Sequence, residues 1–270
     1  MSIVERMENG VPVLVSDSLA AAGGVAHGFS TRLGGVSTGM WDSLNLGLSR
    51  GDDPDRVREN YRRFFAAIGA ESPSMAMSDQ VHGTDVLNVT TADCKQDPYT
   101  KKGLVGDGLM TAVPGIALIV FCSDCIPVLL YDPKRRVIAA LHAGWRGTAA
   151  GIVTKAVAQM TQVYGSDPAD ILAAIGPGID KCCFETHEDV PNAVTANLAG
   201  NGLPFIQLKE NGKFSVDLKG INARRLELAG LSPDHIDLCR ECTHCHPDRF
   251  WSHRRLGTQR GSMAAAIQLL

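Results

Sequence analysis

The chain has 270 residues, of which 44% are hydrophobic, 20% charged and 6% aromatic, and its formal net charge is -3. This is the composition of a globular protein, which excludes a disordered chain and a fibre. The balanced charge, without a basic stripe, argues against nucleic acid as a partner.

Membrane and export segments are not expected. The longest apolar stretch, residues 115–121, is far shorter than the roughly 18 residues that span a bilayer. The first ten residues carry acids and no apolar core, unlike a signal peptide. We therefore expect a cytoplasmic protein. Thiols stay reduced there, so the eight cysteines are better candidates for metal ligands or nucleophiles than for disulfides.

The N-terminal part predicts two short strands, residues 11–15 and 25–29, which lead into the glycine-rich segment 30–39. Glycine lets a backbone approach a ligand closely, so this segment could be a functional loop that presents Arg32 and Asn45. A plain surface loop explains the composition equally well. A helix is expected next, because Asp53 and Pro54 form a helix start and apolar residues follow at helical spacing to residue 67.

The central part predicts the core of a sheet, with three apolar runs at residues 116–121, 126–131 and 137–141. Residues 147–165 have helical periodicity and end at Gly165, so this helix is expected to lie on the sheet. Further strands are expected at 86–89, 171–175, 214–216 and 236–238, helices at 189–198 and 218–228, and a final element in the tail 262–270. No repeat or linker divides this α+β pattern, which predicts one domain over residues 1–270.

The segment between the second and third central runs predicts a hairpin. Asp132 followed by Pro133 is typical of a type I turn. A hairpin centred between Pro133 and Lys134 would place Cys125 directly opposite His142. Opposed side chains lie about 5 Å apart on one face of a sheet, which suits two ligands of one metal or a thiolate and its base. One more residue in the turn would shift this pairing by one.

A second histidine would complete a catalytic zinc site. Tetrahedral zinc held by one cysteine and two histidines keeps its fourth position for water or substrate. His82, in the segment Gln80-Val-His-Gly-Thr84, is the candidate. The alternative is a histidine that only bonds a carbonyl group at a strand end.

A series of motifs runs in order from about residue 25 to the C-terminus. They are His27-Gly-Phe-Ser-Thr-Arg-Leu-Gly-Gly, Ser43-Leu-Asn-Leu-Gly, Gln80-Val-His-Gly-Thr, Asp107-Gly-Leu, Ser123-Asp-Cys-Ile-Pro-Val, Leu141-His-Ala-Gly-Trp-Arg-Gly, Ile175-Gly-Pro, Cys242-Thr-His-Cys and Phe250-Trp-Ser-His-Arg-Arg. This series resembles the YfiH-type family, also called laccase-domain or polyphenol-oxidase proteins and multifunctional purine nucleoside phosphorylases. The motifs His-Ala-Gly-Trp-Arg-Gly and Asp-Cys-x-Pro-Val are the most specific to it.

The resemblance implies a four-layer α/β/β/α sandwich of mixed β-sheets, a fold shared with a group of cysteine hydrolases. It implies that His82, Cys125 and His142 hold a zinc ion, with copper as the less favoured metal. It also implies phosphorolysis of adenosine, inosine and methylthioadenosine, with adenosine deamination as a second activity. A purine nucleoside and phosphate are then the expected partners.

Phosphorolysis requires positive groups around the phosphate. Arg32, Arg146 and Arg254 are the candidates, because arginine binds phosphate in a bidentate manner. Asn45 could bond the ribose or the phosphate. Arg32, Asn45 and Arg146 are therefore expected to act in catalysis beside the three metal ligands. Asp124 could orient a ligand histidine or cap the turn into the hairpin.

The sequence departs from the family pattern in three places. Cys122 and a serine precede the Asp-Cys pair where Thr-Ala is usual, His246 replaces an asparagine, and Gln259 replaces a glycine. Cys122 could compete for the metal, but a residue three positions from Cys125 points to the opposite face of a strand. The loss of glycine leaves open how Arg260 is presented.

The C-terminal cysteines offer a second metal site. Cys239, Cys242 and Cys245 lie close together, and Cys242-x-x-Cys245 has the spacing of half a structural zinc site. The other half would be Cys122 with Cys125, or Cys182 with Cys183. Vicinal cysteines rarely chelate one metal well, so reduced, partly buried thiols are the favoured interpretation.

Three other functions remain open. His244-Cys-His246 resembles a copper motif of multicopper oxidases, but the eight histidines contain no second such pair, so true laccase chemistry is disfavoured. The main rival is a cysteine amidase with Cys125 as nucleophile and His142 as base. It matches the family's description as a peptidoglycan-editing factor that removes a wrong amino acid from UDP-MurNAc. The third is a regulatory module without turnover.

Overall fold

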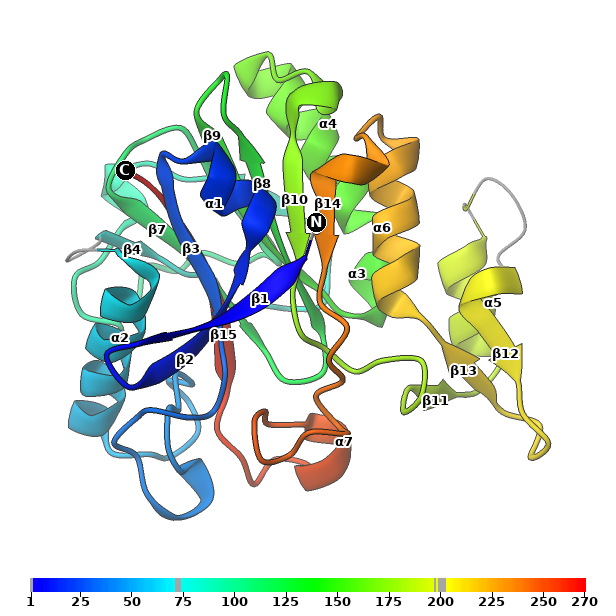
Figure 1. Cartoon of the computed structure of the whole chain (residues 1–270), viewed down its shortest axis with the longest axis horizontal. Coiled ribbons are helices and arrows are strands. Elements are labelled where there is room, and N and C mark those ends of the chain that lie inside the picture. The colour runs from blue at the N-terminus through cyan, green and yellow to red at the C-terminus, as the bar shows by residue number, and fades with distance from the viewer. Residues whose placement is uncertain (1, 71–73, 197, 199–202) are drawn as a thin grey trace.

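The computed structural model describes residues 2–70, 74–196, 198 and 203–270 (Figure 1). The strands of this part are β1 (Ile3–Glu8), β2 (Val11–Ser16), β3 (Val25–Ser30), β4 (Ser74–Ala76), β5 (Val86–Asn88), β6 (Gly108–Thr111), β7 (Ile116–Cys122), β8 (Ile126–Asp132), β9 (Val137–Ala143), β10 (Leu172–Ile175), β11 (Glu185–Thr186), β12 (Ile206–Leu208), β13 (Phe214–Val216), β14 (Ile236–Leu238) and β15 (Met263–Leu269). The α-helices are α1 (Asp17–Ala22), α2 (Pro54–Ile68), α3 (Trp145–Ala149), α4 (Ile152–Tyr164), α5 (Asp189–Thr195), α6 (Leu218–Leu228) and α7 (His253–Leu256). Short 3-10 helices are η1 (Gly39–Trp41), η2 (Thr91–Asp93), η3 (Pro168–Asp170), η4 (Leu203–Phe205) and η5 (Pro233–His235).

The described strands form two six-stranded mixed sheets and one small sheet, which confirms the α+β prediction. The first sheet has the order β1-β2-β3-β15-β7-β4 and is antiparallel except for the β4–β7 pair. The second has the order β14-β10-β8-β9-β6-β5, with parallel pairs only at its two edges. The chain passes from the first sheet to the second between β7 and β8, and this connection carries Cys125.

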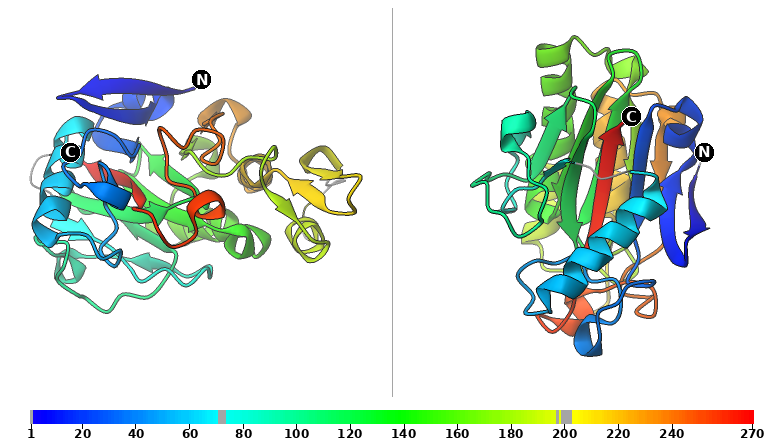
Figure 2. Two further views of the ribbon diagram at one scale, coloured as in Figure 1. Left: turned by 90° about the horizontal axis from the view of Figure 1, so that it is seen from below. Right: turned by 90° about the vertical axis from the view of Figure 1, so that its left-hand side faces the viewer.

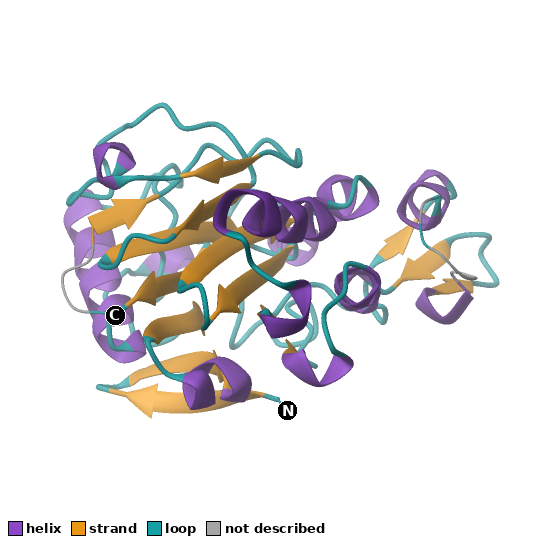
Figure 3. Cartoon of the chain, turned by 90° about the horizontal axis from the view of Figure 1, so that it is seen from above, coloured by secondary structure: helices purple, strands orange, loops and turns teal. Residues whose placement is uncertain are grey.

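Three apolar cores hold these layers together. The two large sheets pack face to face through residues such as Phe29 and Val120 of the first and Leu129 of the second. Helix α2 covers the outer face of the first sheet, and α4 with α6 covers the outer face of the second. In Figure 3 the strands of the large sheets form the middle of the molecule, with helices at its sides.

A smaller lobe stands beside the sheets. The three-stranded sheet β11-β13-β12 and helix α5 extend to the right in Figure 1, and Figure 2 shows the same lobe from below. None of the helices described here combines the length and the apolar composition that a membrane-spanning helix needs.

Several sequence expectations need correction. The predicted helix 147–165 is two helices, α3 and α4, because Gly151 between them adopts a left-handed conformation with a φ of 77°. The predicted helix 189–198 ends as α5 at Thr195, and position 197 lies outside the described residues. Strands β1, β4, β6, β11 and β12 have no counterpart among the predicted strands. The predicted strands at 214–216 and 236–238 and the helix at 218–228 have the observed bounds.

Candidate functional site

Three side chains predicted as ligands converge at the end of the second sheet. The donor atoms of His82, Cys125 and His142 all lie within 4.8 Å of one another. Cys125 Sγ is 3.9 Å from His82 Nε2, and the two imidazole rings stand edge to face with centroids 4.9 Å apart. His142 is buried, Cys125 is partly exposed and His82 is exposed. The group is therefore open to solvent on the His82 side.

The hairpin that carries Cys125 and His142 has a different register from the one predicted. Strands β8 and β9 pair Pro127 with His142, so Cys125 lies two residues before the partner of His142. The turn has four residues, 133–136, because Asp132 Oδ1 accepts the next two free backbone N–H groups at 2.9 and 3.0 Å. A shift of two residues keeps the same face of the strand. Cys125 and His142 still meet for this reason, although their direct opposition was a wrong prediction.

His82 sits on a loop with a demanding backbone. Its φ is 61°, a left-handed conformation that is uncommon for a residue with a Cβ. The carboxylate of Asp107 stabilises this loop by accepting N–H groups from Val81 at 3.1 Å, His82 at 3.0 Å and Gly83 at 2.7 Å. The ring of His82 is thus positioned by the residue that precedes β6.

The same carboxylate orients His142. Asp107 is fully buried, and its Oδ1 lies 2.8 Å from His142 Nδ1. When Nδ1–H of His142 donates a hydrogen bond to Asp107, the lone pair of Nε2 is free to bind a metal ion. The sequence does not predict this role of Asp107, because the spacing of residues does not show which carboxylate reaches a histidine.

The charges of this group are strongly coupled. Burial alone would raise the pKa of the Cys125 thiol, but His142 and then His82 lower it to about 6. Burial opposes protonation of His142, whereas Cys125 and Asp107 raise its pKa to about 9. Burial would raise the pKa of Asp107, and its bonds to His142 and the loop lower it to about 2. The arrangement therefore favours a thiolate at Cys125.

Close packing around the group depends on Gly144. A Cβ at this position would lie 2.9 Å from His82 Cδ2 and 3.3 Å from Cys125 Sγ, so only glycine fits without displacing a candidate ligand. Cys122 does not compete for this place, because it is buried in the core between the sheets.

Asp124 has neither of the roles considered for it. Its carboxylate accepts bonds from Thr243 Oγ1 at 2.6 Å, Ser252 Oγ at 3.0 Å and the backbone N–H of Arg254 at 2.6 Å. It therefore ties the C-terminal segment to the turn beside Cys125, rather than orienting a histidine or capping the hairpin.

Two of the predicted arginines, Arg146 and Arg254, belong to segments that lie next to the three candidate ligands. Arg146 is exposed at the start of α3, two residues after Gly144, with its guanidinium 4.2 Å from the Trp145 ring centroid. The backbone N–H of Arg254 donates to Asp124 Oδ2. Its guanidinium donates from Nη1 to Glu185 O at 2.9 Å and lies over the Phe184 ring.

The other two predicted residues are engaged within the chain. Arg32 donates to Asp42 O from two nitrogens and to Pro247 O at 2.8 Å. Asn45 is fully buried. Its Nδ2 atom donates to Asp52 Oδ2 at 2.9 Å, and its Oδ1 atom accepts from the N–H of Ser262 at 2.9 Å. Both side chains connect segments that are distant in sequence.

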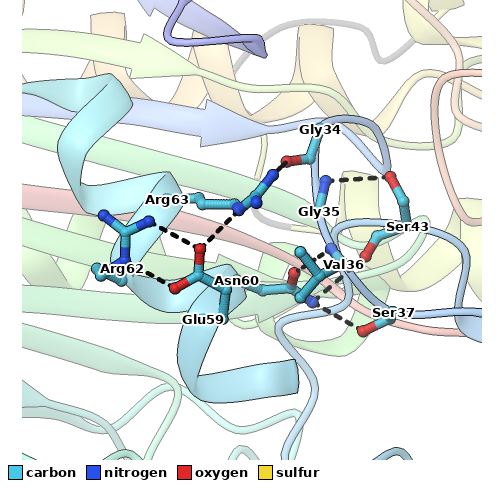
Figure 4. Close-up of polar contacts among 9 residues, drawn as sticks. All are labelled: Gly34, Gly35, Val36, Ser37, Ser43, Glu59, Asn60, Arg62 and Arg63. Carbon is cyan, nitrogen blue, oxygen red and sulfur yellow. Dashed lines mark hydrogen bonds and ion pairs between the residues drawn. The ribbon is translucent and has the colours of Figure 1, made fainter. Parts of the chain in front are cut away.

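The glycine-rich loop packs against helix α2 (Figure 4). Asn60 accepts the N–H of Val36 at 2.8 Å and donates to Ser37 Oγ at 2.8 Å. A Cβ on Gly35 would lie 2.2 Å from Ser43 O, so this glycine permits close contact between backbones. The loop is built into the fold.

Arg260 points into the protein, although Gln259 stands before it in place of the usual glycine. It is 6% exposed and donates from Nη1 to Ser123 Oγ at 2.5 Å and to Gly261 O at 2.8 Å. Burial lowers its pKa to about 10. Its charge supports the turn that contains Asp124 and Cys125, a role that the sequence did not indicate.

A second group of donors lies outside this site. Cys182, Cys183, Cys242 and Cys245 form what we call the four-cysteine cluster, with their Sγ atoms within 4.8 Å of one another. The cluster suggests a metal site. Cys239, which the sequence grouped with two of them, is instead buried between the sheets.

Known proteins resemble the chain over nearly its whole length. The family model described as multi-copper polyphenol oxidoreductase laccase matches residues 26–270. A purine nucleoside phosphorylase of Deinococcus radiodurans is 39% identical over 261 residues, covering 96% of this chain and 94% of that protein. The purine nucleoside phosphorylase YfiH of Escherichia coli is 38% identical over 247 residues, covering 92% and 95%. The crystal structure of YlmD from Geobacillus stearothermophilus has a TM-score of 0.90 at 32% identity, covering 100% of this chain and 99% of that one.

These similarities include both large sheets and the segments that carry the candidate ligands, since they cover almost every residue. They confirm the resemblance that the sequence motifs indicated. Similar members of the matched family are named purine nucleoside phosphorylases. The chain therefore belongs to the YfiH- and YlmD-type family, which is described as multi-copper polyphenol oxidoreductase laccase.

Proposed function

We propose that the protein is a purine nucleoside phosphorylase whose active site is built around His82, Cys125 and His142. The observation that carries the proposal is their convergence at one solvent-accessible place, in a chain whose relatives carry that name. The proposed substrates are adenosine, inosine and methylthioadenosine together with phosphate. The proposed reaction breaks the bond between the purine and C1′ of ribose and forms a bond from a phosphate oxygen to C1′.

The three side chains fit a zinc ion by their chemistry. One thiolate and two imidazoles are an attested catalytic donor set, and three protein ligands leave a position for water or substrate. The bond between His142 Nδ1 and Asp107 is the support that a ligand histidine usually has. Zinc bound here would act as a Lewis acid. Copper is the alternative ion.

The chain's own cations are proposed to hold the phosphate. Arg146 and Arg254 are the favoured pair, because each is attached to a segment that borders the three ligands. Arginine binds phosphate through parallel N–H bonds, which fixes its orientation toward the ribose. We propose that Arg32 and Asn45 contribute by maintaining the surrounding segments, since their polar groups already have partners in the chain.

Adenosine deamination is proposed as a second activity of the same site, because a zinc site with an open position can activate water for attack on the purine. The stacking of α2, the two sheets and α4 supports the four-layer sandwich as the fold, and its relation to cysteine hydrolases remains a prediction. A single domain and a cytoplasmic location also remain predictions.

A second candidate is a cysteine amidase that edits peptidoglycan precursors. It is favoured by one observation: the Sγ atom of Cys125 lies within 4.8 Å of a ring nitrogen of His142, in a setting that lowers the pKa of the thiol to about 6. Such a pair has the properties of a nucleophile and its base. Polyphenol oxidation is kept as a third possibility only for a copper-loaded protein.

The deciding experiment incubates zinc-replete protein with adenosine, with and without phosphate, and separates the products. Adenine formed only with phosphate supports phosphorolysis, and inosine supports deamination. Cys125→Ser should abolish both, whereas Cys94→Ser is the matched control, because Cys94 contacts Thr90 O outside both donor groups. If neither adenine nor inosine forms, and the protein instead releases the amino acid from a muramyl amide substrate, the proposal is overturned in favour of the amidase.

A further inference from the structure

The four-cysteine cluster joins two loops that are far apart in sequence. Cys182 and Cys183 lie between β10 and β11, and Cys242 and Cys245 follow β14. Cys245 Sγ is 3.6 Å from Cys182 Sγ and 3.4 Å from Cys183 Sγ. The vicinal pair therefore directs both sulfurs to one place, contrary to the expectation that vicinal cysteines chelate poorly. All four residues are free thiols.

The spacing of the sulfurs matches a tetrahedral tetrathiolate. With zinc–sulfur bonds of about 2.3 Å, the edges of the tetrahedron measure about 3.8 Å. The contacts of Cys245 with Cys182 and Cys183 lie slightly below this length, and every pair is within 4.8 Å. Bringing every pair to the tetrahedral edge therefore changes the sulfur–sulfur distances by about 1 Å or less.

Backbone contacts hold the two loops together beside the sulfurs. Gly178 and Cys242 form a parallel bridge, and the N–H of Thr243 donates to Gly178 O at 3.2 Å. The N–H of Asp180 donates to Cys242 Sγ at 3.3 Å. Such a bond stabilises a thiolate and orients it, as the outer contacts of metal ligands do.

A buried lysine fixes the same two loops. Lys219 is 1% exposed, and its ammonium donates to Asp180 Oδ2 at 3.1 Å on the first loop. It also donates to Cys239 O at 3.0 Å and to Glu241 O at 2.7 Å on the second. The positions of the four sulfurs are thus prepared by contacts that do not include them.

We propose that Cys182, Cys183, Cys242 and Cys245 bind a structural zinc ion, separate from the site at Cys125. Four thiolates with tetrahedral spacing select zinc or iron–sulfur chemistry over harder cations. The sulfurs complete the coordination of one ion and leave no position for substrate, which is the arrangement of a structural site.

The bound ion would fasten one wall of the proposed active site. The residues after the vicinal pair, Phe184 and Glu185, contact the guanidinium of Arg254. Thr243, between the other two cysteines, donates to Asp124 beside Cys125. Loss of the ion would remove one of the connections between the two loops, which support Arg254 and the Asp124 turn.

Metal analysis of the whole purified protein tests this directly. Wild type loaded with zinc and passed through a desalting column should retain about two ions per chain. The variants Cys182→Ser and Cys245→Ser should each retain about one ion and lower the midpoint of thermal unfolding, and Cys125→Ser should lose the other ion. Cys94→Ser is the control and should retain both. One ion in wild type that only Cys125→Ser removes would overturn the proposal.

A spectroscopic measurement adds a test that does not depend on substituting the cluster cysteines. Cobalt should replace zinc and give the visible bands of a tetrahedral ion with strong sulfur-to-cobalt absorption, and this absorption should persist in Cys125→Ser. An iron–sulfur chromophore in the purified protein, or a disulfide between the cluster cysteines under reducing conditions, would contradict the zinc assignment. Neither outcome bears on the phosphorolysis assay, so the two proposals fail separately.

Discussion

Asp107 gives the sharpest single test of how the candidate site is built, through the substitution Asp107→Asn. Its Oδ1 accepts from His142 Nδ1 and from the N–H of His82, and its Oδ2 accepts from the N–H groups of Val81 and Gly83. Asparagine replaces one of these oxygens with an NH₂ group, which cannot accept. In either orientation of the amide, two donors of the fully buried carboxylate lose their partner.

The expected losses follow from these contacts. Two N–H groups that lose their partner at this buried carboxylate cost about 1–3 kcal/mol each, so the free energy of unfolding should fall by roughly 2–6 kcal/mol. A missing support for a ligand histidine typically lowers metal affinity or activity by about 10–100-fold. Zinc affinity is measured by competition with a chromophoric chelator, and stability by urea unfolding of the zinc-free protein.

Asp85→Asn is the matched control, because Asp85 is an exposed carboxylate on the same loop, and it should change neither quantity. Unchanged zinc affinity in Asp107→Asn, at a stability equal to wild type, would refute the reasoning that this carboxylate organises both histidines.

Three further predictions address the surroundings of the site. Gly144→Ala places a Cβ 2.9 Å from His82 Cδ2, so zinc affinity in the same competition assay should fall about tenfold, and an unchanged value would contradict the packing argument. Arg254→Ala should raise the KM for phosphate about tenfold or more and leave the KM for the nucleoside nearly unchanged, as checked by steady-state kinetics at varied phosphate. Burial lowers the pKa of His27 from 6.5 to about 4, so the folded state loses stability as the pH falls below 6.5. Urea unfolding at pH 7 and pH 5 should show a loss of about 2 kcal/mol that is absent in His27→Gln, and equal losses in both proteins would sink this assignment.

The regular elements were largely predictable because their apolar periodicity is strong. Helix α2 has a proline start, a side-chain cap from Asp53 and a glycine end, and its predicted bounds differ by one residue from the observed ones. The strands β7, β8 and β9 are buried along nearly their whole length and appear as apolar runs. Helix α4 was misjudged because helical spacing continues through Gly151, whose backbone conformation the pattern does not reveal.

Contacts between distant segments were the harder part. The sequence made His82 a candidate partner of Cys125, but only the family resemblance assigned both to one ion, since a loop and a strand connection meet there without a shared periodicity. The predicted hairpin register was off by two residues because the side chain of Asp132 selects a longer turn. Asp107 and the partnership of Cys182 with Cys245 depend on tertiary contacts that no spacing rule contains.

The zinc dependence of adenosine phosphorolysis shows whether His82, Cys125 and His142 form the active site. The protein is stripped with a chelator and reloaded with increasing zinc, and purine release in phosphate buffer is followed alongside occupancy of the Cys125 site. We expect turnover to follow occupancy of that site in wild type and in Cys182→Ser, and to stay absent in Cys125→Ser at every zinc concentration. Full phosphorolysis by the metal-free enzyme, or by zinc-loaded Cys125→Ser, would contradict this expectation.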